Sequence, residues 1–496
     1  MFGQFILSNL ICIFERYKDS NAFHICNLNY TYLEFSKTIS KIRTQLQKED
    51  FSSKNIGLIA NNDLETYAAI VAIWLEGLAY VPLHPCYPDD RKKEIINDAK
   101  LDLIIDSSGN IEIEEVKLIK SKELTFREFN LEHKKVNDDQ LAYILYTSGS
   151  TGKPKGVPIS RLNLASFVHS FNHLGIELSK EDRCLQYFDL TFDISIQSYL
   201  IPLLKGACIY TVSHESIKPV VAIELMEVHK ITFAAIPPSM IWYLRSYFDE
   251  IELPYLKTNI LCAEASAVQL IDEWKHCIPN ARILNLYGPT EATIYCTYSE
   301  FYRNALNKEL NGMMTIGKPF KSIRIVVIDE DDCIQSVNGM GELCISGETV
   351  TQGYWNNIEK NKSSFVYKII DGEEYRFYRT GDNCFIDEEG DIMLAGRLDH
   401  QVKVQGYRIE LGEIEAHARV FLNGANAVAI TFRNKSGLMQ IALLLENVIF
   451  DYIKLDQFLR KKLPPYMIPS KYKMLELLPL NSNGKVDRLA LKKLYE

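Results

Sequence analysis

Long hydrophobic runs are missing from this chain. A helix that crosses a bilayer needs at least about 18 apolar residues with few or no charges, and no stretch of the sequence supplies them. Paired cysteines are missing too, because the 11 cysteines are scattered, odd in number and free of any C-x-x-C pair. The sequence therefore predicts no membrane span, no cysteine metal site, and reduced thiols as in a cytoplasmic protein.

An excess of positive charge is also absent. Lysine and arginine number 55 against 64 aspartates and glutamates, which gives a net charge of −9. Proteins that bind nucleic acid mainly through its phosphates present a basic surface, so nucleic acid is not expected as a partner. What the chain does have is size and apolar content: 496 residues, 47% of them hydrophobic, predict two or more well-packed domains.

Short apolar strands alternate with helical stretches along the first two thirds of the chain. Residues 56–59 and 232–236 are typical strands, and 63–76 has the length and pattern of a helix. This alternation predicts an α/β fold of stacked, mostly parallel sheets flanked by helices. Beyond residues 323–328 the strands become shorter and turns more frequent, which predicts a β-rich subdomain.

One loop indicates a ligand. Residues 143–157 read Tyr-Ile-Leu-Tyr-Thr-Ser-Gly-Ser-Thr-Gly-Lys-Pro-Lys-Gly-Val, an apolar strand followed by glycines, hydroxyls and lysines. Glycines let backbone N–H groups approach an anion closely, and the hydroxyls and lysines add donors and charge. Neither the Walker A spacing nor G-x-G-x-x-G is present. A flexible surface loop would explain the composition but not the order, so a polyphosphate ligand is predicted. The residues expected to hold it are Thr147, Ser148, Gly149, Ser150, Thr151, Gly152 and Lys155.

This loop resembles the phosphate-binding core of the adenylate-forming superfamily, which comprises acyl-CoA ligases, firefly-type luciferases and the amino-acid adenylation domains of nonribosomal peptide synthetases. Further segments are similar to that family and follow in its order. They are residues 30–35, 77–83, 192–195, 285–291, 341–347, 378–382, 396–399, 401–403, 406–415 and 483–487. The resemblance thus runs almost from end to end.

The resemblance implies a division that composition alone does not reveal. Residues 1–398 are expected to form a large core that binds ATP and substrate. Residues 399–496 are expected to form a small, mobile α+β lid, with its hinge at Asp399. Rotation of the lid would withdraw one catalytic residue and bring residues 403–406 towards the active site for a second step.

The resemblance also assigns nucleotide contacts. Glu291 is expected to hold Mg²⁺, although a glutamate at a helix start is its simpler explanation. Tyr287 is expected to pack against adenine, and Asp382 to accept both ribose hydroxyls with support from Arg397. The other residues assigned to the ATP site are Glu264, Ala265, Asn285, Gly288 and Thr290.

Lys485 is the residue expected to matter most for catalysis, together with Glu291 and Thr147. In the family pattern this lysine reaches from the lid and bridges the substrate carboxylate and the α-phosphate. A positive charge there stabilises the pentavalent transition state as pyrophosphate leaves. An isolated lysine near a C-terminus is usually only solvated, but the motif around position 485 argues against that interpretation.

Asp193 decides the expected substrate class. This chain resembles amino-acid adenylation domains, which place an aspartate at this position to pair with the substrate's α-ammonium group. Alternatively, Asp193 could cap the helix that follows it. The remaining pocket positions are Ile194, Gln197, Ser239, Ile260, Cys262, Leu286, Ile294 and Tyr295. Several are bulky, which favours a small side chain. D-alanine:carrier protein ligases also have a cysteine at the position that matches Cys262, so this resemblance makes D-alanine the leading candidate.

Three functions remain open from the sequence. The preferred one is ATP- and Mg²⁺-dependent activation of an amino acid to aminoacyl-AMP, then transfer to the phosphopantetheine thiol of a carrier protein acting in trans. No carrier or condensation motif occurs in the sequence itself. The second is a carboxylic acid:CoA ligase of the same superfamily, and Asp193 argues against it. The third is a nucleotide-binding module without catalysis.

Overall fold

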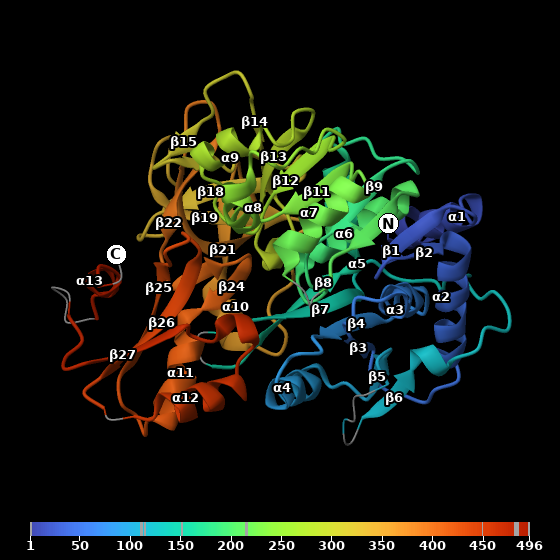
Figure 1. Cartoon of the computed structure of the whole chain (residues 1–496), viewed down its shortest axis with the longest axis horizontal. Helices are drawn as coiled ribbons and strands as arrows, with labels where there is room; N and C mark the ends of the chain where they lie inside the picture. The colour runs from blue at the N-terminus through green and yellow to red at the C-terminus, as the bar shows by residue number, and fades with distance from the viewer. Residues whose placement is uncertain are drawn as a thin grey trace.

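The computed structural model describes residues 2–109, 113, 116–149, 152–213, 217–448, 450–480 and 486–494. It confirms the α/β fold: two large, mostly parallel sheets lie side by side with helices around and between them, and a β-rich region and a smaller unit follow. In Figure 1 the C-terminal elements gather at one end of the molecule and the N-terminal elements at the other.

The larger sheet carries the strands whose ends reach the candidate site. In spatial order its strands are β17 (Lys318–Pro319), β14 (Thr297–Phe301), β13 (Arg282–Tyr287), β12 (Thr258–Leu261), β11 (Phe233–Ile236), β9 (Arg183–Gln186), β10 (Cys208–Thr211), β1 (Asn21–Ile25) and β2 (Leu28–Thr31). The strands from β13 to β1 pair in parallel, and the two edges pair antiparallel. Their carboxyl ends therefore meet along one rim of the sheet, where ligands bind in such folds.

The second sheet carries the predicted phosphate loop. Its strands in spatial order are β6 (Lys117–Lys120), β5 (Leu103–Asp106), β3 (Asn55–Ile59), β4 (Ala79–Leu83), β7 (Leu141–Thr147) and β8 (Lys155–Ser160). All neighbouring strands pair in parallel except β7 and β8. These two pair antiparallel, with Leu141 opposite Ser160 and Thr147 opposite Lys155. The loop predicted to bind phosphate is thus the connection of a β-hairpin.

Two helices fill the space between the sheets. Nearly every residue of α3 (Leu64–Leu75) and α6 (Asp193–Lys205) is buried, as expected of helices that are apolar all round. The Asp63 carboxylate caps α3 by accepting the Thr66 N–H at 3.0 Å, and Gly206 ends α6 in the left-handed conformation. The other helices of this part are α1 (Ser8–Arg16), α2 (Tyr32–Leu46), α4 (Asp89–Ala99), α5 (Arg161–Asn172), α7 (Lys218–Val228), α8 (Pro238–Leu244) and α9 (Val268–Trp274).

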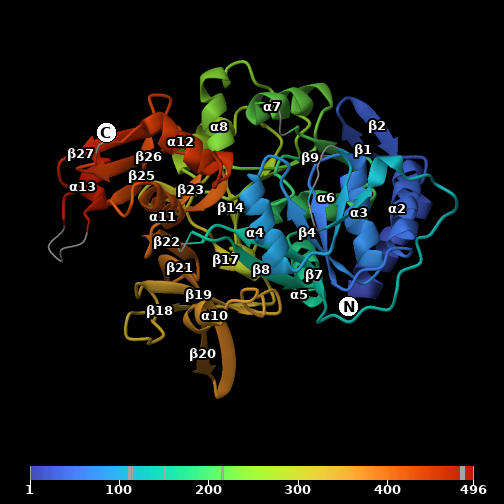
Figure 2. The same cartoon turned by 90° about the horizontal axis from the view of Figure 1, so that it is seen from below.

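The β-rich subdomain follows, as the sequence predicts. Its antiparallel sheet contains β18 (Ile323–Ile328), β19 (Gly341–Gly347), β20 (Phe365–Ile370), β21 (Glu373–Ile386) and β22 (Ile392–Arg397), with α10 (Ile358–Ser364) beside it. In Figure 2 this sheet projects away from the two large ones. The long strand β21 carries Asp382 and pairs it with Arg397 on β22, which sets two predicted ribose contacts side by side.

The residues after β22 form a small unit that we call the lid. It consists of β23 (Gln401–Val404), β24 (Tyr407–Glu410), α11 (Leu411–Phe421), β25 (Ala427–Arg433), β26 (Met439–Glu446), α12 (Tyr452–Arg460), β27 (Lys471–Leu475) and α13 (Arg488–Lys492). It has a buried apolar cluster of its own between α11, α12 and the sheet of β25, β26 and β27. The exact domain boundary at residues 398 and 399 stays a prediction.

A search of the described residues for membrane-spanning helices finds none of sufficient length and apolar character. The cytoplasmic location expected from the cysteine pattern stays a prediction.

Candidate active site

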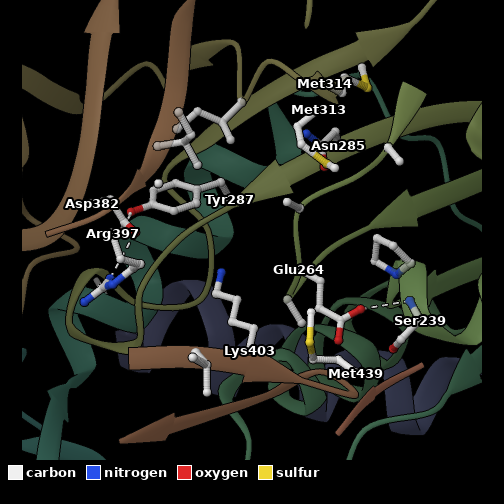
Figure 3. A pocket seen from close by; sticks show the side chains of 18 of the residues that line it. Ser239, Glu264, Asn285, Tyr287, Met313, Met314, Asp382, Arg397, Lys403 and Met439 are labelled. Atoms are coloured by element: carbon white, nitrogen blue, oxygen red, sulfur yellow. Dashed lines mark hydrogen bonds and ion pairs between the residues drawn. The ribbon is translucent and has the colours of Figure 1, made fainter. Parts of the chain in front are cut away.

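A cavity of about 550 Å³ opens where the carboxyl ends of β12 and β13 face the lid. The core lines it with Glu264 after β12 and with Asn285 and Tyr287 at the end of β13. The opposite wall comes from Arg397 on β22 and from Lys403 on β23. Figure 3 shows Lys403 extending from its strand into the space between these two walls. The cavity therefore lies between the core and the lid.

One corner of the cavity unites the predicted nucleoside contacts. The Tyr287 hydroxyl donates to Asp382 Oδ2 at 2.5 Å, and Arg397 Nη1 donates to Asp382 Oδ1 at 3.0 Å. Burial and the neighbouring carboxylate raise the pKa of Tyr287 well above its usual value, so its hydroxyl remains a donor. The Lys403 ammonium lies 5.6 Å from the centre of the Tyr287 ring. The geometry suits a flat ring and two ribose hydroxyls beside Asp382.

Glu264 lies on the other side of the cavity and links core to lid. Its Oε2 accepts the backbone N–H of Ser239 at 2.8 Å, and its Oε1 accepts the N–H of Gly406 at 2.6 Å. Gly406 has a φ of 83° and lies 3.6 Å, measured from a built Cβ, from Pro237. Only glycine adopts this backbone without strain.

The predicted substrate pocket is only partly open to the cavity. Ile194, Ser239, Leu286 and Tyr295 line it. Four other predicted positions are buried and do not line it: Gln197, Ile260, Cys262 and Ile294.

Asp193 begins α6 immediately beside Ile194 and is 7% exposed. No lysine or arginine among the described residues forms an ion pair with it, although the more distant Arg408 charge favours its ionised form. The N-cap position of α6 is held by Phe192. Burial raises the pKa of Asp193 to about 6, even though a hydrogen bond from Thr290 opposes the shift. A buried carboxylate without a cation is a strong candidate for pairing with a ligand's positive group.

Glu291 lies on the short turn after β13 and is fully buried. Its Oε2 is 2.9 Å from Arg408 Nη1, and its Oε1 accepts the Tyr354 hydroxyl at 2.6 Å. Burial alone would raise the pKa of Glu291, but the Arg408 charge and the Tyr354 hydrogen bond outweigh it and lower the pKa to about 2. The carboxylate therefore stays ionised, as a ligand of a hard cation must.

The described residues contain no cluster of three histidine, cysteine or acidic side chains that could hold a metal ion. A metal at Glu291 would need its other ligands from the nucleotide's phosphates and from water, which is normal for Mg²⁺. The single carboxylate fits that role.

The predicted phosphate loop is covered by the lid. The Ser148 hydroxyl donates to the Arg408 carbonyl at 3.1 Å and accepts the Glu410 N–H at 3.0 Å. The Gly149 N–H donates to Glu413 Oε2 at 2.9 Å. The Lys155 ammonium is 2.9 Å from Glu410 Oε1. These donors face lid atoms and do not line the cavity.

The structure thus separates the predicted ATP contacts into two groups. Those that line the cavity are Glu264, Ala265, Asn285, Tyr287, Gly288, Asp382 and Arg397. Those outside its lining are Thr147, Ser148, Gly149, Gly152, Lys155, Thr290 and Glu291. Ser150, Thr151 and Lys485 lie outside the described residues. Asp399, the predicted hinge, pairs with Arg397 at 2.5 Å.

A second cavity of about 350 Å³ adjoins the first and shares Ser239 and Leu438 with it. Core residues such as Phe192 and the lid residues Gly406 and Tyr407 form its walls. The Tyr407 hydroxyl donates to Asp189 Oδ2 at 2.8 Å, across the interface between core and lid. The two cavities are therefore neighbours, and both have walls from the core and from the lid.

Several contacts at the site could not be predicted from the sequence. Glu410 and Glu413 belong to the family-like segment 406–415, but nothing in that segment predicts that they reach the loop of residues 148–155. Tyr354 carries no local signal at all, because its partner Glu291 is 63 positions away in sequence.

The site brings together the residues predicted to hold the nucleoside, the predicted phosphate loop and a buried carboxylate, an arrangement expected of an enzyme that binds an adenine nucleotide. The chain belongs to the AMP-binding enzyme family, whose sequence pattern matches residues 14–355. The resemblance to adenylate-forming enzymes is thereby confirmed.

Its relatives include proteins much longer than this chain. The chain is 31% identical over 488 residues to tyrocidine synthase 1 of Brevibacillus parabrevis, a match covering 96% of this chain and 44% of the relative. It is also 31% identical over 449 residues to delta-poly-L-ornithine synthetase of Acinetobacter baumannii, covering 88% of this chain and 32% of the relative. The chain spans less than half the length of these curated relatives.

Solved adenylation domains share the fold. The Vibrio cholerae adenylation domain AlmE, solved in complex with glycyl-adenosine-5'-phosphate, has a TM-score of 0.87 and 25% identity, covering 98% of this chain and 97% of that one. The fused adenylation–PCP protein NpsA–ThdA of Klebsiella oxytoca has a TM-score of 0.83 and 22% identity, covering 94% and 92%, which shows the fold alone. The closer resemblance to D-alanine ligases stays a prediction.

Proposed function

We propose that this protein activates an amino acid with ATP, forming aminoacyl-AMP and pyrophosphate, and then transfers the aminoacyl group to the phosphopantetheine thiol of a carrier protein. The observation that carries the proposal is Asp193, a buried carboxylate with no ion-pair partner among the described residues, next in sequence to Ile194, which lines the main cavity. An α-ammonium group supplies the missing cation. A substrate without an amino group would leave this charge buried and unpaired.

The comparisons support the same chemistry. AlmE is named as bound to glycyl-adenosine-5'-phosphate, an aminoacyl adenylate, and the curated relatives are named as tyrocidine synthase 1 and delta-poly-L-ornithine synthetase. In this chain Tyr287, Asp382 and Arg397 are arranged to hold the nucleoside of such an adenylate. Asp193 and the cavity wall around Ile194 would then hold the amino acid.

The proposed substrate has a small side chain, with D-alanine as the leading candidate and glycine as another. Ile194, Leu286 and Tyr295 close the cavity on the side of the buried pocket positions. A long side chain would have to displace several of these well-packed groups, which is unfavourable in a close-packed interior.

Glu291 is proposed to hold Mg²⁺ together with the phosphates of ATP. The bound metal would neutralise charge on the phosphates while the carboxylate of the amino-acid substrate attacks the α-phosphate. Arg408 of the lid now neutralises Glu291 at 2.9 Å, so metal binding there requires this contact to open.

The transfer step is proposed to use the lid orientation seen here, reached by rotation about Asp399 between the core (residues 1–398) and the lid (399–496). The second cavity leads to Gly406 and Ser239, next to the main cavity. A flexible pantetheine arm could bring its thiol through this cavity to the acyl group. Lys485 would serve the first step in another lid orientation.

Amino-acid-dependent ATP–pyrophosphate exchange tests the proposal. The panel should contain the L-amino acids, glycine, D-alanine, and several aryl and fatty acids. We expect exchange with a small amino acid, and a loss of at least about a hundredfold in kcat/KM in Asp193→Asn, because an unpaired buried ammonium is costly. Exchange only with carboxylates that lack an amino group would refute the proposal and favour a CoA ligase. No exchange with any acid would favour a binding module.

A further inference from the structure

Two histidines lie one turn apart at the C-terminal end of α5. His169 belongs to the last turn of the helix, and His173 follows it as the C-cap, still in helical conformation with φ −80° and ψ −4°. Both residues are exposed, and the centres of their rings are 4.6 Å apart. Residues four apart on a helix share one face, so the two imidazoles are neighbours on the surface of the protein.

A hydrogen bond prepares His173 to bind a metal. Its Nδ1 lies 2.8 Å from the backbone carbonyl oxygen of His169. A carbonyl oxygen can only accept, so Nδ1 carries the proton, and in the neutral ring Nε2 carries the lone pair. Histidines that ligate metals commonly have their other ring nitrogen held in this way, which fixes the tautomer and the orientation of the ring.

Each ring also keeps a nitrogen for a ligand. No other residue that the structure describes forms a hydrogen bond or an ion pair with the ring nitrogens of His169 or with Nε2 of His173. An incoming ion would therefore displace only water from the pair.

The helix end that carries the two histidines is firmly held. Phe167 and Phe171 of the same helix are buried, with their ring centres 5.8 Å apart. Arg282 Nη1 donates to the backbone carbonyl of Leu174, the residue after His173, at 2.7 Å. Two ligands on one rigid turn lose little freedom when they bind the same ion, which favours chelation.

The ligand type selects the kind of ion. Neutral imidazole suits Cu²⁺, Ni²⁺ and Zn²⁺, whereas Mg²⁺ and Ca²⁺ prefer oxygen ligands. Two histidines four positions apart are also the spacing by which one helix face presents two ligands to a zinc ion. The described residues add no third histidine, cysteine or acidic side chain to the pair, so water would complete the coordination.

We propose that His169 and His173 form a surface site for a divalent transition-metal ion of the Cu²⁺, Ni²⁺ and Zn²⁺ class. The bound ion links the last turn of α5 to its C-cap and stabilises the folded chain, because unfolding separates the two ligands. The site is separate from Glu291 and does not depend on the proposed adenylation chemistry.

Titration of the full, untagged chain with nickel chloride tests the site. The chain is first freed of metal with a chelator, and its accessible thiols are blocked with N-ethylmaleimide, because exposed cysteines such as Cys12 and Cys26 also bind such ions. We expect calorimetry to show a site whose affinity falls at least about tenfold in His169→Gln and in His173→Gln, since each removes one of two ligands. Ni²⁺ should raise the melting temperature of the wild type and not that of either variant.

His276→Gln is the matched control. His276 is exposed as well, but its ring contacts no other histidine among the described residues. This variant should bind Ni²⁺ with wild-type affinity and show the same rise in melting temperature. Without metal, all three variants should melt close to the wild type, because substitutions of exposed side chains change stability little.

Two results would overturn the inference. One is the absence of Ni²⁺ binding in the wild type at millimolar concentration, and the other is wild-type affinity in His169→Gln or in His173→Gln, because a chelate needs both ligands. A nickel site elsewhere on the chain would persist in all three variants, so it would not imitate the expected result.

Discussion

At the scale of single residues, the charge on Asp193 lowers the stability of the fold but is the charge that the proposed substrate needs. Its folded pKa of about 6 lies above the value of 3.8 for a free aspartate, because burial disfavours the charged form. The charged form therefore destabilises the fold above pH 6, by about 3 kcal/mol at neutral pH. Protonation relieves this cost as the pH falls through 6, but it also removes the charge that the α-ammonium needs.

This predicts opposite effects of pH on binding and on stability. As the pH falls below about 6, the KM for the amino acid should rise while kcat changes little, measured by exchange at saturating ATP. Asp193→Asn should lose amino-acid affinity at every pH and should raise, or leave unchanged, the melting temperature at pH 7.

Asp182→Asn is the control for the stability effect. Burial would raise the pKa of Asp182, but Lys257, Thr232 and Ser179 together lower it. A lowered folded pKa means stability that is present at neutral pH and lost in acid, so this substitution should lower the melting temperature. If both variants melted alike, Asp193 would have to be a structural residue.

At the scale of elements, the lid is fixed to the core by the turn between β25 and β26. Trp242 Nε1 on α8 donates to the Ser436 carbonyl at 2.9 Å, and the guanidinium of Arg433 lies 5.6 Å from the Trp242 ring centre. Gly437 has a φ of 76°, and a Cβ built there would lie 2.2 Å from Trp242 Nε1. No side chain fits between the turn and this ring.

Gly437→Ala should therefore loosen the lid in the orientation seen here. We expect the rate of aminoacyl transfer to fall several-fold while ATP–pyrophosphate exchange stays near the wild-type rate, both measured on the same preparation. Gly424→Ala is the matched control, because Gly424 also has a positive φ, 93°, but nothing lies within 4 Å of its built Cβ. Both variants bear the backbone strain of about 1 kcal/mol. Equal transfer rates in the two would show that the clash has no role.

The sequence could predict the elements that depend on local signals, but it could not predict contacts between residues far apart in the chain. The strand over 56–59 matches β3 (Asn55–Ile59), and the helix over 63–76 matches α3, because apolar periodicity and the Asp63 cap are local signals. The resemblance named Tyr287, Asp382 and Arg397, which the structure brings together, and their role at the nucleoside stays a prediction. The contact between Trp242 and Ser436 joins positions 194 apart, and the contact between Gly149 and Glu413 joins positions 264 apart. No local pattern encodes such pairs, so they could not be predicted.

At the scale of the whole molecule, the proposed two-step reaction requires the lid to turn a different face towards the main cavity in each step. In the orientation seen here Lys403 and Arg408 line the cavity, and Glu410 and Glu413 cover the loop that ATP would need. If ATP binds this loop as proposed, ATP and this lid position exclude each other there. A motif series can indicate that a lid exists, but its orientation depends on the sum of many interface contacts, each too small to read from the sequence.

The positions of residues 487 and 488, next to Lys485 in sequence, lead to a prediction about the two half-reactions. The Asp487 N–H donates to the Pro479 carbonyl at 2.7 Å, and Arg488 Nη1 donates to the carbonyl of Ala429 on β25 at 2.5 Å, so both residues are held by other residues of the lid. Neither lines the main cavity. If Lys485 acts only in another orientation, the two half-reactions must separate in a variant that lacks it.

Lys485→Ala should lower ATP–pyrophosphate exchange by about a hundredfold or more, the usual loss when one charge-stabilising donor is removed. Transfer from a supplied, preformed aminoacyl adenylate to the carrier should stay within about twofold of the wild-type rate, because this orientation offers the thiol its cavity without that lysine. Lys492→Ala on α13 controls for loss of a lid charge and should change neither rate. Equal losses in both half-reactions would mean that Lys485 acts through lid folding, and a single lid orientation would then have to serve both steps.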